Sequence, residues 1–485
     1  MTNSYKKFTK DVGFVSIARI VGVLKSLIML PILTKTLGAE FYGIWAQILV
    51  TISLLMPLAL LQLEFAMTRF LTAEEDKNKV SKGISSIFVT VMLTASLISF
   101  LIFILAEPFA MAVFGGAGAT YFVKISAFLI LLTTLDQIIL QYFISFRQMK
   151  RYSCFAILQT IGEALLIGYL VLSGYGLFGA IISLLLVKVF ILIIGLLLVK
   201  SEIKITTPSL SVIKHYLSFS LPLIPFQLSW WLVNSGDRYV IGYFLGASQV
   251  GIYSASYSMG YLISFLYAPI GPVLFPAITK LYENNNIHEV KIHLKYALKF
   301  FLVLAIPSSF GLTILSKSLL TILTTSEFAE VYLIVPIVAF GTLLYCMGNL
   351  FSDILLLFKM TKIISLVFGS SALVNLVMNI FLVPLMGIIG AAISTLVTFA
   401  ILFSILAFVS FESLSFDWDP GFIIKSVVSS AVMGFLIWRM NPVGAVGILI
   451  SIGIAAVVYF GVLLLLKGFT REEYMFFKTC LSILK

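Results

Sequence analysis

The sequence predicts an all-α integral membrane protein of about fourteen transmembrane helices. Of its 485 residues, 60% are hydrophobic and only 11% are charged, whereas a soluble protein has about 25% charged residues. The apolar runs are continuous, as in VFILIIGLLLV at 189–199, while the strands of a membrane β-barrel alternate apolar and polar residues. Helices of about 20 apolar residues are therefore the spanning elements expected here.

Fourteen stretches of the sequence are apolar and long enough to cross a bilayer. The first, from Val12 to Leu33, is too long for the apolar core of a signal peptide, and no small-residue cleavage site follows it. We therefore expect it to remain as the first membrane helix. The expected helices span residues 11–34, 41–67, 83–106, 122–146, 153–173, 177–199, 214–240, 250–276, 291–315, 330–356, 363–384, 388–410, 421–438 and 444–466.

Lysine and arginine are distributed unevenly between the two sides of these helices. Most of the 32 lie at the two termini and in every second connection. Because basic connections stay in the cytoplasm, we expect a multi-pass protein of the plasma membrane with both termini cytoplasmic. The net charge of +11 then reflects topology, so we expect no nucleic acid as a partner. The basic residues expected on the outer side are Lys35, Lys124, Arg238, Lys317 and Arg439.

Cysteines and histidines give no pattern typical of a metal site or a disulfide framework. The 3 cysteines are far apart and form no CxxC pair, and the 3 histidines lie in polar connections. The sequence also has no Walker A phosphate loop. We therefore expect no metal, no cofactor and no use of ATP.

The chain contains an internal repeat. LGAEFYGIW at 37–45 matches LGASQVGIY at 245–253, and YGLFGAIIS at 175–183 matches MGIIGAAIS at 386–394. A third match pairs RQMKR (147–151) with FKMTK (358–362), at the same offset of 211 residues as the second. Six helices fall in each copy, so both copies have the same orientation in the membrane. The predicted parts are a first lobe (1–205), a second lobe (206–412), and two extra helices with a cytoplasmic amphipathic tail (413–485).

Two similar six-helix lobes beside a central cleft are the architecture of transporters that work by alternating access. Prolines inside a helix remove hydrogen bonds and permit bending, so Pro222 and Pro225 mark a candidate hinge or gate. Asp237 and Arg238 lie near the outer end of the same predicted helix. They are candidates for the same hinge, or else a structural ion pair.

The motif residues of the two repeat copies occur in this chain together with an extra pair of helices. In the first copy they are Leu37, Gly38, Ala39, Gly43, Ile44, Trp45, Gly179 and Ala180, and in the second Asp237, Arg238, Leu245, Gly246, Ala247, Gly251, Ile252, Tyr253, Gly390 and Ala391. Over about residues 1–410 this pattern resembles the polysaccharide-biosynthesis, or O-antigen-type, flippases of the multidrug/oligosaccharidyl-lipid/polysaccharide exporter superfamily.

The resemblance implies a transporter and not an enzyme. It implies that the substrate is a glycan linked to a polyprenyl (di)phosphate, moved from the cytoplasmic to the outer leaflet for polysaccharide biosynthesis. Membrane lipids, a coupling ion (H⁺ or Na⁺) and glycan polymerase machinery are the further partners that it implies. A lipid II flippase and an ion-coupled multidrug or cation antiporter of the same superfamily stay open as alternatives. A membrane glycosyltransferase is disfavoured because the connections are too short to hold a catalytic domain.

Basic residues inside the predicted spans are the candidates for binding an anionic lipid diphosphate. Charged groups within a bilayer are costly and usually face a cavity or a partner. Arg19 and Lys25 lie in the first helix and Lys188 in the sixth. Arg19 is the first choice because a guanidinium binds phosphate oxygens in pairs. The alternative is an ion pair within the protein, joining Arg19 or Lys25 to Glu163 or Asp136.

Acidic residues within the spans have other expected roles. Asp136 and Glu163 lie near the middle of their helices and are candidates for binding a coupling ion or for pairing with a base. Glu64 and Asp353 lie near cytoplasmic ends, so we expect them to be solvated or to pair with Arg69 and Lys359.

Two further pairs of polar or aromatic residues have a structural and a binding interpretation. Asn375 and Asn379 share one helix face by their spacing, and packing between helices is favoured over binding of sugar hydroxyls. Trp230 and Trp231 are adjacent and must point in different directions, so at most one of them is expected to stack on a sugar.

Overall fold

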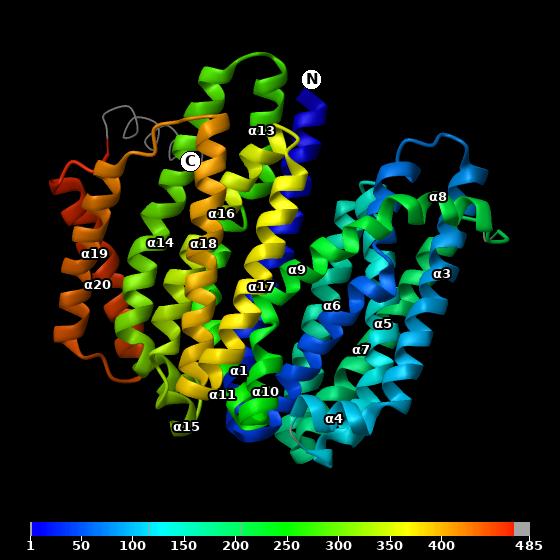
Figure 1. Cartoon of the computed structure of the whole chain (residues 1–485), viewed down its shortest axis with the longest axis horizontal. Helices are drawn as coiled ribbons and strands as arrows, with labels where there is room; N and C mark the ends of the chain where they lie inside the picture. Colours follow the sequence, from blue (N-terminus) through cyan, green and yellow to red (C-terminus); the bar gives the residue numbers. More distant parts are fainter. Residues whose placement is uncertain (1, 115, 205, 470–485) are drawn as a thin grey trace. The chain divides into compact units, whose positions relative to one another are not determined.

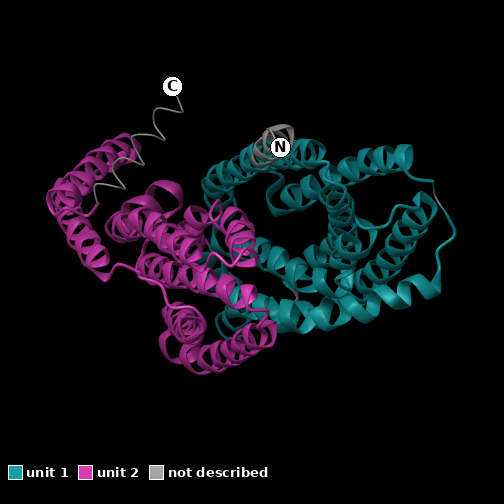
Figure 2. Ribbon diagram, turned by 90° about the horizontal axis from the view of Figure 1, so that it is seen from above, with its two compact units in different colours: residues 1–254 teal, residues 255–485 magenta. Residues whose placement is uncertain are grey.

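The computed structural model describes residues 2–114, 116–204 and 206–469, which form helices and no strands (Figure 1). The chain divides into two compact units, residues 1–254 and 255–485 (Figure 2). The all-α membrane fold predicted from the sequence is thereby confirmed.

The first unit is a set of long helices that lie side by side. In Figure 1, α3 packs on α5, α5 on α7, α7 on α6 and α6 on α1. Its elements are α1 (Thr2–Leu60), α2 (Leu63–Ala66), η1 (Met67–Leu71), α3 (Lys77–Ile104), α4 (Ala106–Phe114), η2 (Ala117–Ala119), α5 (Thr120–Ser145), α6 (Met149–Leu170), η3 (Val171–Tyr175), α7 (Gly176–Glu202), α8 (Leu210–Ser220), η4 (Leu221–Leu223), α9 (Ile224–Ser235), α10 (Asp237–Leu245) and the start of α11 (Ala247–Gly260).

The second unit has its own packed core, in which α16 contacts α18, α18 contacts α17, and α14 contacts α16. The hairpin of α19 and α20 packs against α14. The tail predicted to be amphipathic, 470–485, lies outside the described residues. The elements of this unit after α11 are η5 (Tyr261–Ile263), α12 (Ser264–Tyr267), α13 (Gly271–Glu283), α14 (Ile287–Leu323), α15 (Ser326–Ala329), α16 (Ile334–Leu357), α17 (Thr361–Met386), α18 (Ile388–Ser413), α19 (Pro420–Met440) and α20 (Gly444–Leu465).

Among the described residues, 11 helical stretches are long and apolar enough to cross a membrane. Two of these stretches, 13–60 and 149–202, each contain two of the predicted helices. They run on through Gly38 and Gly174, whose backbone conformations are not helical. The predicted helix at 214–240 is not among the 11, because it is broken into shorter pieces. The number of fourteen therefore stays a prediction.

The predicted helix at 214–240 is wrong as a continuous helix. It is replaced by α8, η4, α9 and α10, and Pro222 and Pro225 lie at the starts of η4 and α9. The predicted helix at 250–276 lies within the stretch 247–283, one of the 11, in which the chain passes through α11, η5, α12 and α13, with Pro272 at the start of α13. Proline has no N–H to continue a helix but fits its first turn, so each helix restarts there. The expected connection between 106 and 122 also contains a helix, α4.

Glycines at equivalent positions of the repeat motifs have the same backbone conformation. Gly38 has φ 69° and ψ 178°, and Gly246 has φ 83° and ψ 175°. Gly176 has φ 53° and ψ −141°, and Gly387 has φ 64° and ψ −149°. Residues with a side chain rarely adopt a positive φ, so these four positions require glycine. This agreement supports the repeat, while the boundaries at 205 and 412 stay a prediction.

The outer hairpins of the two copies contact each other through glycine. A Cβ atom on Gly43 would lie 1.8 Å from the carbonyl oxygen of Ala247, and a Cβ on Gly251 would lie 2.1 Å from the carbonyl oxygen of Ala39. Gly43 and Gly251 are equivalent in the repeat, as are Ala39 and Ala247. The contact is therefore reciprocal, and it brings residues far apart in the sequence to one point within the first unit.

Candidate functional site

Four charged side chains from four helices of the first unit meet in one network, in which both acids are buried and both lysines are partly exposed. They are Lys25 on α1, Asp136 on α5, Glu163 on α6 and Lys188 on α7. The Lys25 ammonium pairs with the Glu163 carboxylate. Lys188 Nζ lies 3.6 Å from Asp136 Oδ2 and 3.9 Å from Glu163 Oε1. Two bases and two acids thus form a network with no net charge.

The four charged groups differ in how many hydrogen bonds and ion pairs they make. Glu163 also accepts a hydrogen bond of 2.9 Å from Gln159 Nε2 on its own helix. Asp136 has a side chain that is 1% exposed, and neither of its oxygens has a hydrogen-bond partner among the described residues. Lys188 is therefore the only ion-pair partner of Asp136 in the part of the chain that the structure describes. Asp136 is the least satisfied member of the network.

The predicted phosphate-binding residues divide into two groups. Lys25 and Lys188 lie together and are paired with acids, as in the alternative of an internal ion pair. Arg19 lies on an exposed face of α1, and the ion pairs of Glu163 and Asp136 run to the two lysines and not to Arg19. The structure thus joins four of the five predicted residues in one network. Gln159 was missed because its amide matters only through its contact with Glu163.

Asp237 and Arg238, at the start of α10, form a second buried ion pair, 2.6 Å between Arg238 Nη1 and Asp237 Oδ1. Arg238 also donates to the backbone oxygen of Asn234, and Tyr253 donates to Asp237. The Arg238 guanidinium lies over the Tyr253 ring, 5.3 Å from its centre. These contacts join α9, α10 and α11 and support the structural interpretation of the pair. Its role as a hinge with Pro222 and Pro225 stays a prediction.

Other predicted polar and aromatic residues serve packing. Asn379 Nδ2 donates to Asn375 Oδ1 at 3.0 Å, and Asn375 donates to Thr398 on α18, so this pair joins two helices. Trp231 is 6% exposed and donates to Ser53, whereas Trp230 is 39% exposed. The two indoles therefore face different environments, as adjacent helical residues must.

Two acids near the predicted cytoplasmic ends do not behave as expected. Glu64 is 9% exposed and has no ion pair among the described residues, while the Arg69 guanidinium lies over the Phe219 ring instead. Asp353 accepts a hydrogen bond of 3.2 Å from Tyr267 and does not pair with Lys359. The expected pairing with Arg69 and Lys359 is therefore wrong for both acids, and the expected solvation is wrong for Glu64, which is buried, while Asp353 stays partly exposed.

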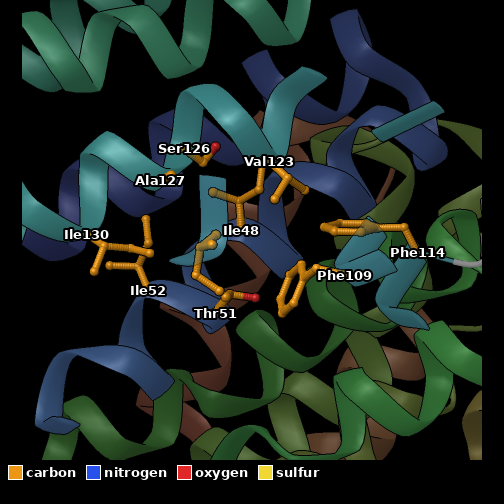
Figure 3. A pocket seen from close by; sticks show the side chains of 10 residues that line it. Ile48, Thr51, Ile52, Phe109, Phe114, Val123, Ser126, Ala127 and Ile130 are labelled. Carbon is orange, nitrogen blue, oxygen red and sulfur yellow. The ribbon is translucent and has the colours of Figure 1, made fainter. Parts of the chain in front are cut away.

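A small cavity in the first unit is separate from the charge network. Its volume is about 20 Å³, which is room for one water molecule and not for a sugar. Figure 3 shows that mostly apolar side chains line it. Its hydroxyls, on Thr51 and Ser126, are both bonded to other groups. This cavity therefore has no features of a glycan site.

Comparison with known families and proteins gives consistent matches. A model of the family described as "Polysaccharide biosynthesis protein" matches residues 8–282. The chain is similar to the "Probable low-salt glycan biosynthesis flippase Agl15" of Haloferax volcanii, with 24% identity over 296 residues, 61% of each chain. It is also similar to the "Probable flippase AglR" of the same organism, with 28% identity over 49% of this chain and 51% of that one. The chain thus spans about half to three fifths of the length of these curated relatives.

Solved structures show the same fold. The lipid II flippase MurJ in an inward closed conformation has a TM-score of 0.73 at 19% identity, covering 95% of this chain and 99% of that one. A multidrug resistance MATE family transporter in an inward-facing conformation has a TM-score of 0.62 at 14% identity, covering 83% of this chain and 98% of that one. At these identities the likeness concerns the fold alone.

Proposed function

The chain belongs to the polysaccharide biosynthesis protein family, and from this premise we propose that it is a flippase for a glycan linked to a polyprenyl diphosphate. The substrate would pass from the cytoplasmic to the outer leaflet by alternating access of the two lobes. The observation that carries the proposal is the network in which Lys25 and Lys188 are held by Glu163 and Asp136.

The relatives support the class of substrate. The Haloferax volcanii proteins similar to this chain are named as flippases, one of them for glycan biosynthesis. The fold is that of the lipid II flippase MurJ, whose name also gives a lipid-linked substrate. An ion gradient or removal of the product would be enough to drive such a movement without ATP.

A diphosphate needs positive charge to replace its hydration when it leaves water. Lys25 and Lys188 supply two such charges on neighbouring helices, and in this structure two carboxylates neutralise them. We infer that the diphosphate and the carboxylates compete for the same ammonium groups. Arg19, on an exposed face of the same helix as Lys25, is the proposed group of first contact.

Competition of this kind links substrate binding to a coupling ion. When the diphosphate takes the lysines, Asp136 and Glu163 lose their partners in a buried place. A carboxylate in that position gains a proton or binds a cation, because burial of an unpaired charge is costly. Uptake of H⁺ or Na⁺ by these two acids would then accompany binding of the anionic substrate.

Two alternative functions, with other substrates, remain as possible outcomes of the test. A lipid II flippase would use the same diphosphate chemistry, and the MurJ-like fold suits it. A multidrug antiporter, for which the MATE-like fold is the support, would bind cations and would need its acids unpaired. A site for cations would need more acids than bases. Because acids and bases are equal in number in the network, an anionic substrate is favoured over a cationic one.

The proposal is tested in proteoliposomes that carry a fluorescent polyprenyl diphosphate disaccharide in the inner leaflet. The chain should move this lipid to the outer leaflet, where an added quencher reaches it, and should not move a fluorescent phosphatidylcholine. The variant Lys25→Gln/Glu163→Gln removes a base with its paired acid and so keeps the site neutral. Its rate should fall about 30-fold or more, the loss expected when a charge-assisted contact is removed.

A matched control is the exposed ion pair of Lys79 and Glu74, 3.8 Å apart, changed in the same way to glutamines. This variant should flip the lipid at the parent rate. Equal transport of the disaccharide lipid by the network variant and the parent would contradict the proposed site. Transport of lipid II alone, or of a cationic dye alone, would replace the proposed substrate by one of the two alternatives.

A further inference from the structure

Glu64 differs from every other buried acid in the first unit. Asp136, Glu163 and Asp237 each have a lysine or arginine within the distance of an ion pair. Glu64 is 9% exposed, yet it has no ion pair in the part of the chain that the structure describes. Its Oε2 atom is inaccessible to solvent and has no hydrogen-bond partner there.

Glu64 lies at a break in the chain. α1 ends at Leu60, and α2 begins at Leu63. The two residues between them, Leu61 and Gln62, have φ values of 51° and 55°, a left-handed conformation that costs residues with a side chain about 1 kcal/mol or more each. Gln62 is 1% exposed, and its Oε1 atom is a second buried oxygen without a partner.

Apolar packing surrounds this break. Leu60, Leu63, Ala66 and Met67 are all 2% exposed or less and belong to one hydrophobic cluster. Burial of an ionised carboxylate in such surroundings without a compensating charge is strongly unfavourable. A form of Glu64 without negative charge is therefore favoured at this position.

The elements that pack most closely against α2, η1 and α8, bring no cation to Glu64. The parts of α3, α5 and α7 in the same cluster contribute apolar residues and Tyr142. The Arg69 guanidinium on η1 lies 4.4 Å from the centre of the Phe219 ring. His215 and Tyr216 on α8 pack against Phe70, and Lys214 is exposed. None of these groups forms an ion pair with Glu64 among the described residues.

We propose that Glu64 is a proton-binding site, and that the proton it holds keeps the α1–α2 break closed. A proton on the carboxyl removes the negative charge and adds a hydrogen-bond donor at a break where two buried oxygens have no partner. Loss of the proton would leave a bare carboxylate in the apolar cluster, so the break would open to bring water to it. The strained conformation of Leu61 and Gln62 favours that rearrangement. This site is distinct from the network of Asp136 and Glu163, and it does not depend on the identity of the substrate.

Infrared spectroscopy tests the bound proton directly in the purified full-length protein. Protonated carboxyl groups give a carbonyl band that shifts in D₂O, and one component of this band should be absent from Glu64→Gln. Glutamine has the shape and the neutrality of protonated glutamate, so this variant should fold. In the control Glu74→Gln, which changes an acid whose side chain is 32% exposed, the band should equal that of the parent. An unchanged band in Glu64→Gln would overturn the proposal.

Accessibility of the break tests the consequence. In a background with the three native cysteines replaced by serine, Leu61→Cys is labelled with a maleimide over a range of pH, and its rate is divided by that of Lys79→Cys to remove the effect of thiol ionisation. The normalised rate should rise about tenfold or more as the Glu64 band disappears, and should stay flat when Glu64→Gln is added. A rise that persists with Glu64→Gln would overturn the link between proton and break. A Glu64 band absent at every pH, with ²²Na⁺ binding that Glu64→Gln abolishes, would replace the proton by sodium.

Discussion

The Nζ atom of Lys188 on α7 lies 3.6 Å from the Oδ2 atom of Asp136 on α5, and their side chains are 11% and 1% exposed. The pair is too long for a hydrogen bond, yet it supplies the only opposite charge to Asp136 among the described residues. Such an arrangement holds two helices together without fixing the lysine firmly to one acid, since Glu163 lies 3.9 Å from the same ammonium.

Lys188→Met should destabilise the protein because it leaves Asp136 buried without a partner. Loss of one member of a buried pair costs about 3–5 kcal/mol. The double variant Lys188→Met/Asp136→Asn should recover most of that loss, since no buried charge remains unpaired. Thermal unfolding in detergent measures both variants. Lys79→Met, which disrupts the exposed pair with Glu74, should change stability by less than about 1 kcal/mol. A double variant no more stable than Lys188→Met would show that the two charges do not stabilise each other.

The reciprocal glycine contact gives a second prediction. Gly43→Ala and Gly251→Ala should each destabilise the first unit by at least about 1–3 kcal/mol, the cost of overpacking, because the new Cβ meets backbone atoms at 1.8 Å and 2.1 Å. Backbone cannot move aside as a flexible side chain does. Gly453→Ala is the matched control, since nothing lies within 4 Å of its added Cβ. Its stability, measured by the same thermal unfolding, should equal that of the parent or exceed it slightly.

The repeat could be recognised in the sequence because its glycines have a physical function. Gly38 and Gly246, and likewise Gly176 and Gly387, adopt matching positive φ values, so no other residue replaces them easily. The third motif pair was aligned one residue out. Arg147 and Lys359, each two residues after the end of a helix, share φ values of 55° and 59°, which gives an offset of 212 and not 211. Neither residue is a glycine, so the sequence held no marker for that register.

The members of the charge network could be predicted, but their pairing could not. Position within an apolar span was enough to single out Lys25, Asp136, Glu163 and Lys188. Which acid meets which base depends on how α1, α5, α6 and α7 are rotated against one another, and hydrophobicity all round a membrane helix conceals that rotation. The broken helices were also beyond prediction from the sequence. Proline only bends some membrane helices but ends others, and the sequence does not say which will happen.

The linker between α18 and α19 gives a prediction about pH. A hydrogen bond of 2.5 Å from Lys295 holds the pKa of Asp417 below its usual value. Burial raises the pKa of Asp419, but hydrogen bonds from Lys299 and from the backbone N–H of Phe422 outweigh it, so this pKa is also lowered. Lowered pKa values in the folded state stabilise the linker above the unfolded value of about 3.9. That contribution is lost as the pH falls through the folded values.

Hydrogen–deuterium exchange of residues 414–419 measures this effect. Exchange should accelerate beyond its intrinsic dependence on pH below about pH 4, and Asp417→Asn/Asp419→Asn should show the faster exchange already at neutral pH. Lys299→Met should have a larger effect than Lys295→Met, because the Lys299 side chain is 4% exposed and that of Lys295 is 32% exposed. Glu412→Gln is the control. Linker exchange that is equal in the double variant and the parent at neutral pH would show that the two carboxylates do not hold the linker.

Membrane topology gives a fourth prediction, based on the uneven distribution of lysine and arginine. In cells, single cysteines that replace Lys77, Arg151 or Lys204 should react with a membrane-impermeant maleimide only after the membrane is permeabilised. A cysteine at Tyr175, which is 59% exposed, should react in intact cells. The background lacks the native cysteines. Labelling of the Arg151 position in intact cells would reverse the orientation and with it the proposed direction of transport.

The last prediction concerns Arg19, which is expected to meet the diphosphate before the lysines do. Arg19→Ala should reduce transport of the polyprenyl diphosphate disaccharide about 30-fold or more, since loss of one partner of a poorly solvated charge-assisted contact costs about 2–5 kcal/mol. Arg19→Lys should restore transport only in part, because an ammonium keeps the charge but loses the paired hydrogen bonds of a guanidinium. Flipping in proteoliposomes, at equal protein per vesicle, measures both variants.

A second substitution separates recognition from folding. Glu163 pairs with Lys25 in this structure, so adding Glu163→Gln to Arg19→Ala should not recover transport, whereas adding it to Lys25→Ala should recover thermal stability. Rescue of both stability and transport in Arg19→Ala/Glu163→Gln would instead make Arg19 a structural partner of Glu163 in another conformation. Full activity of a stable Arg19→Ala variant would remove Arg19 from the site. Binding of the diphosphate would then rest on Lys25 and Lys188, the two bases whose release from Glu163 and Asp136 the proposed mechanism already requires.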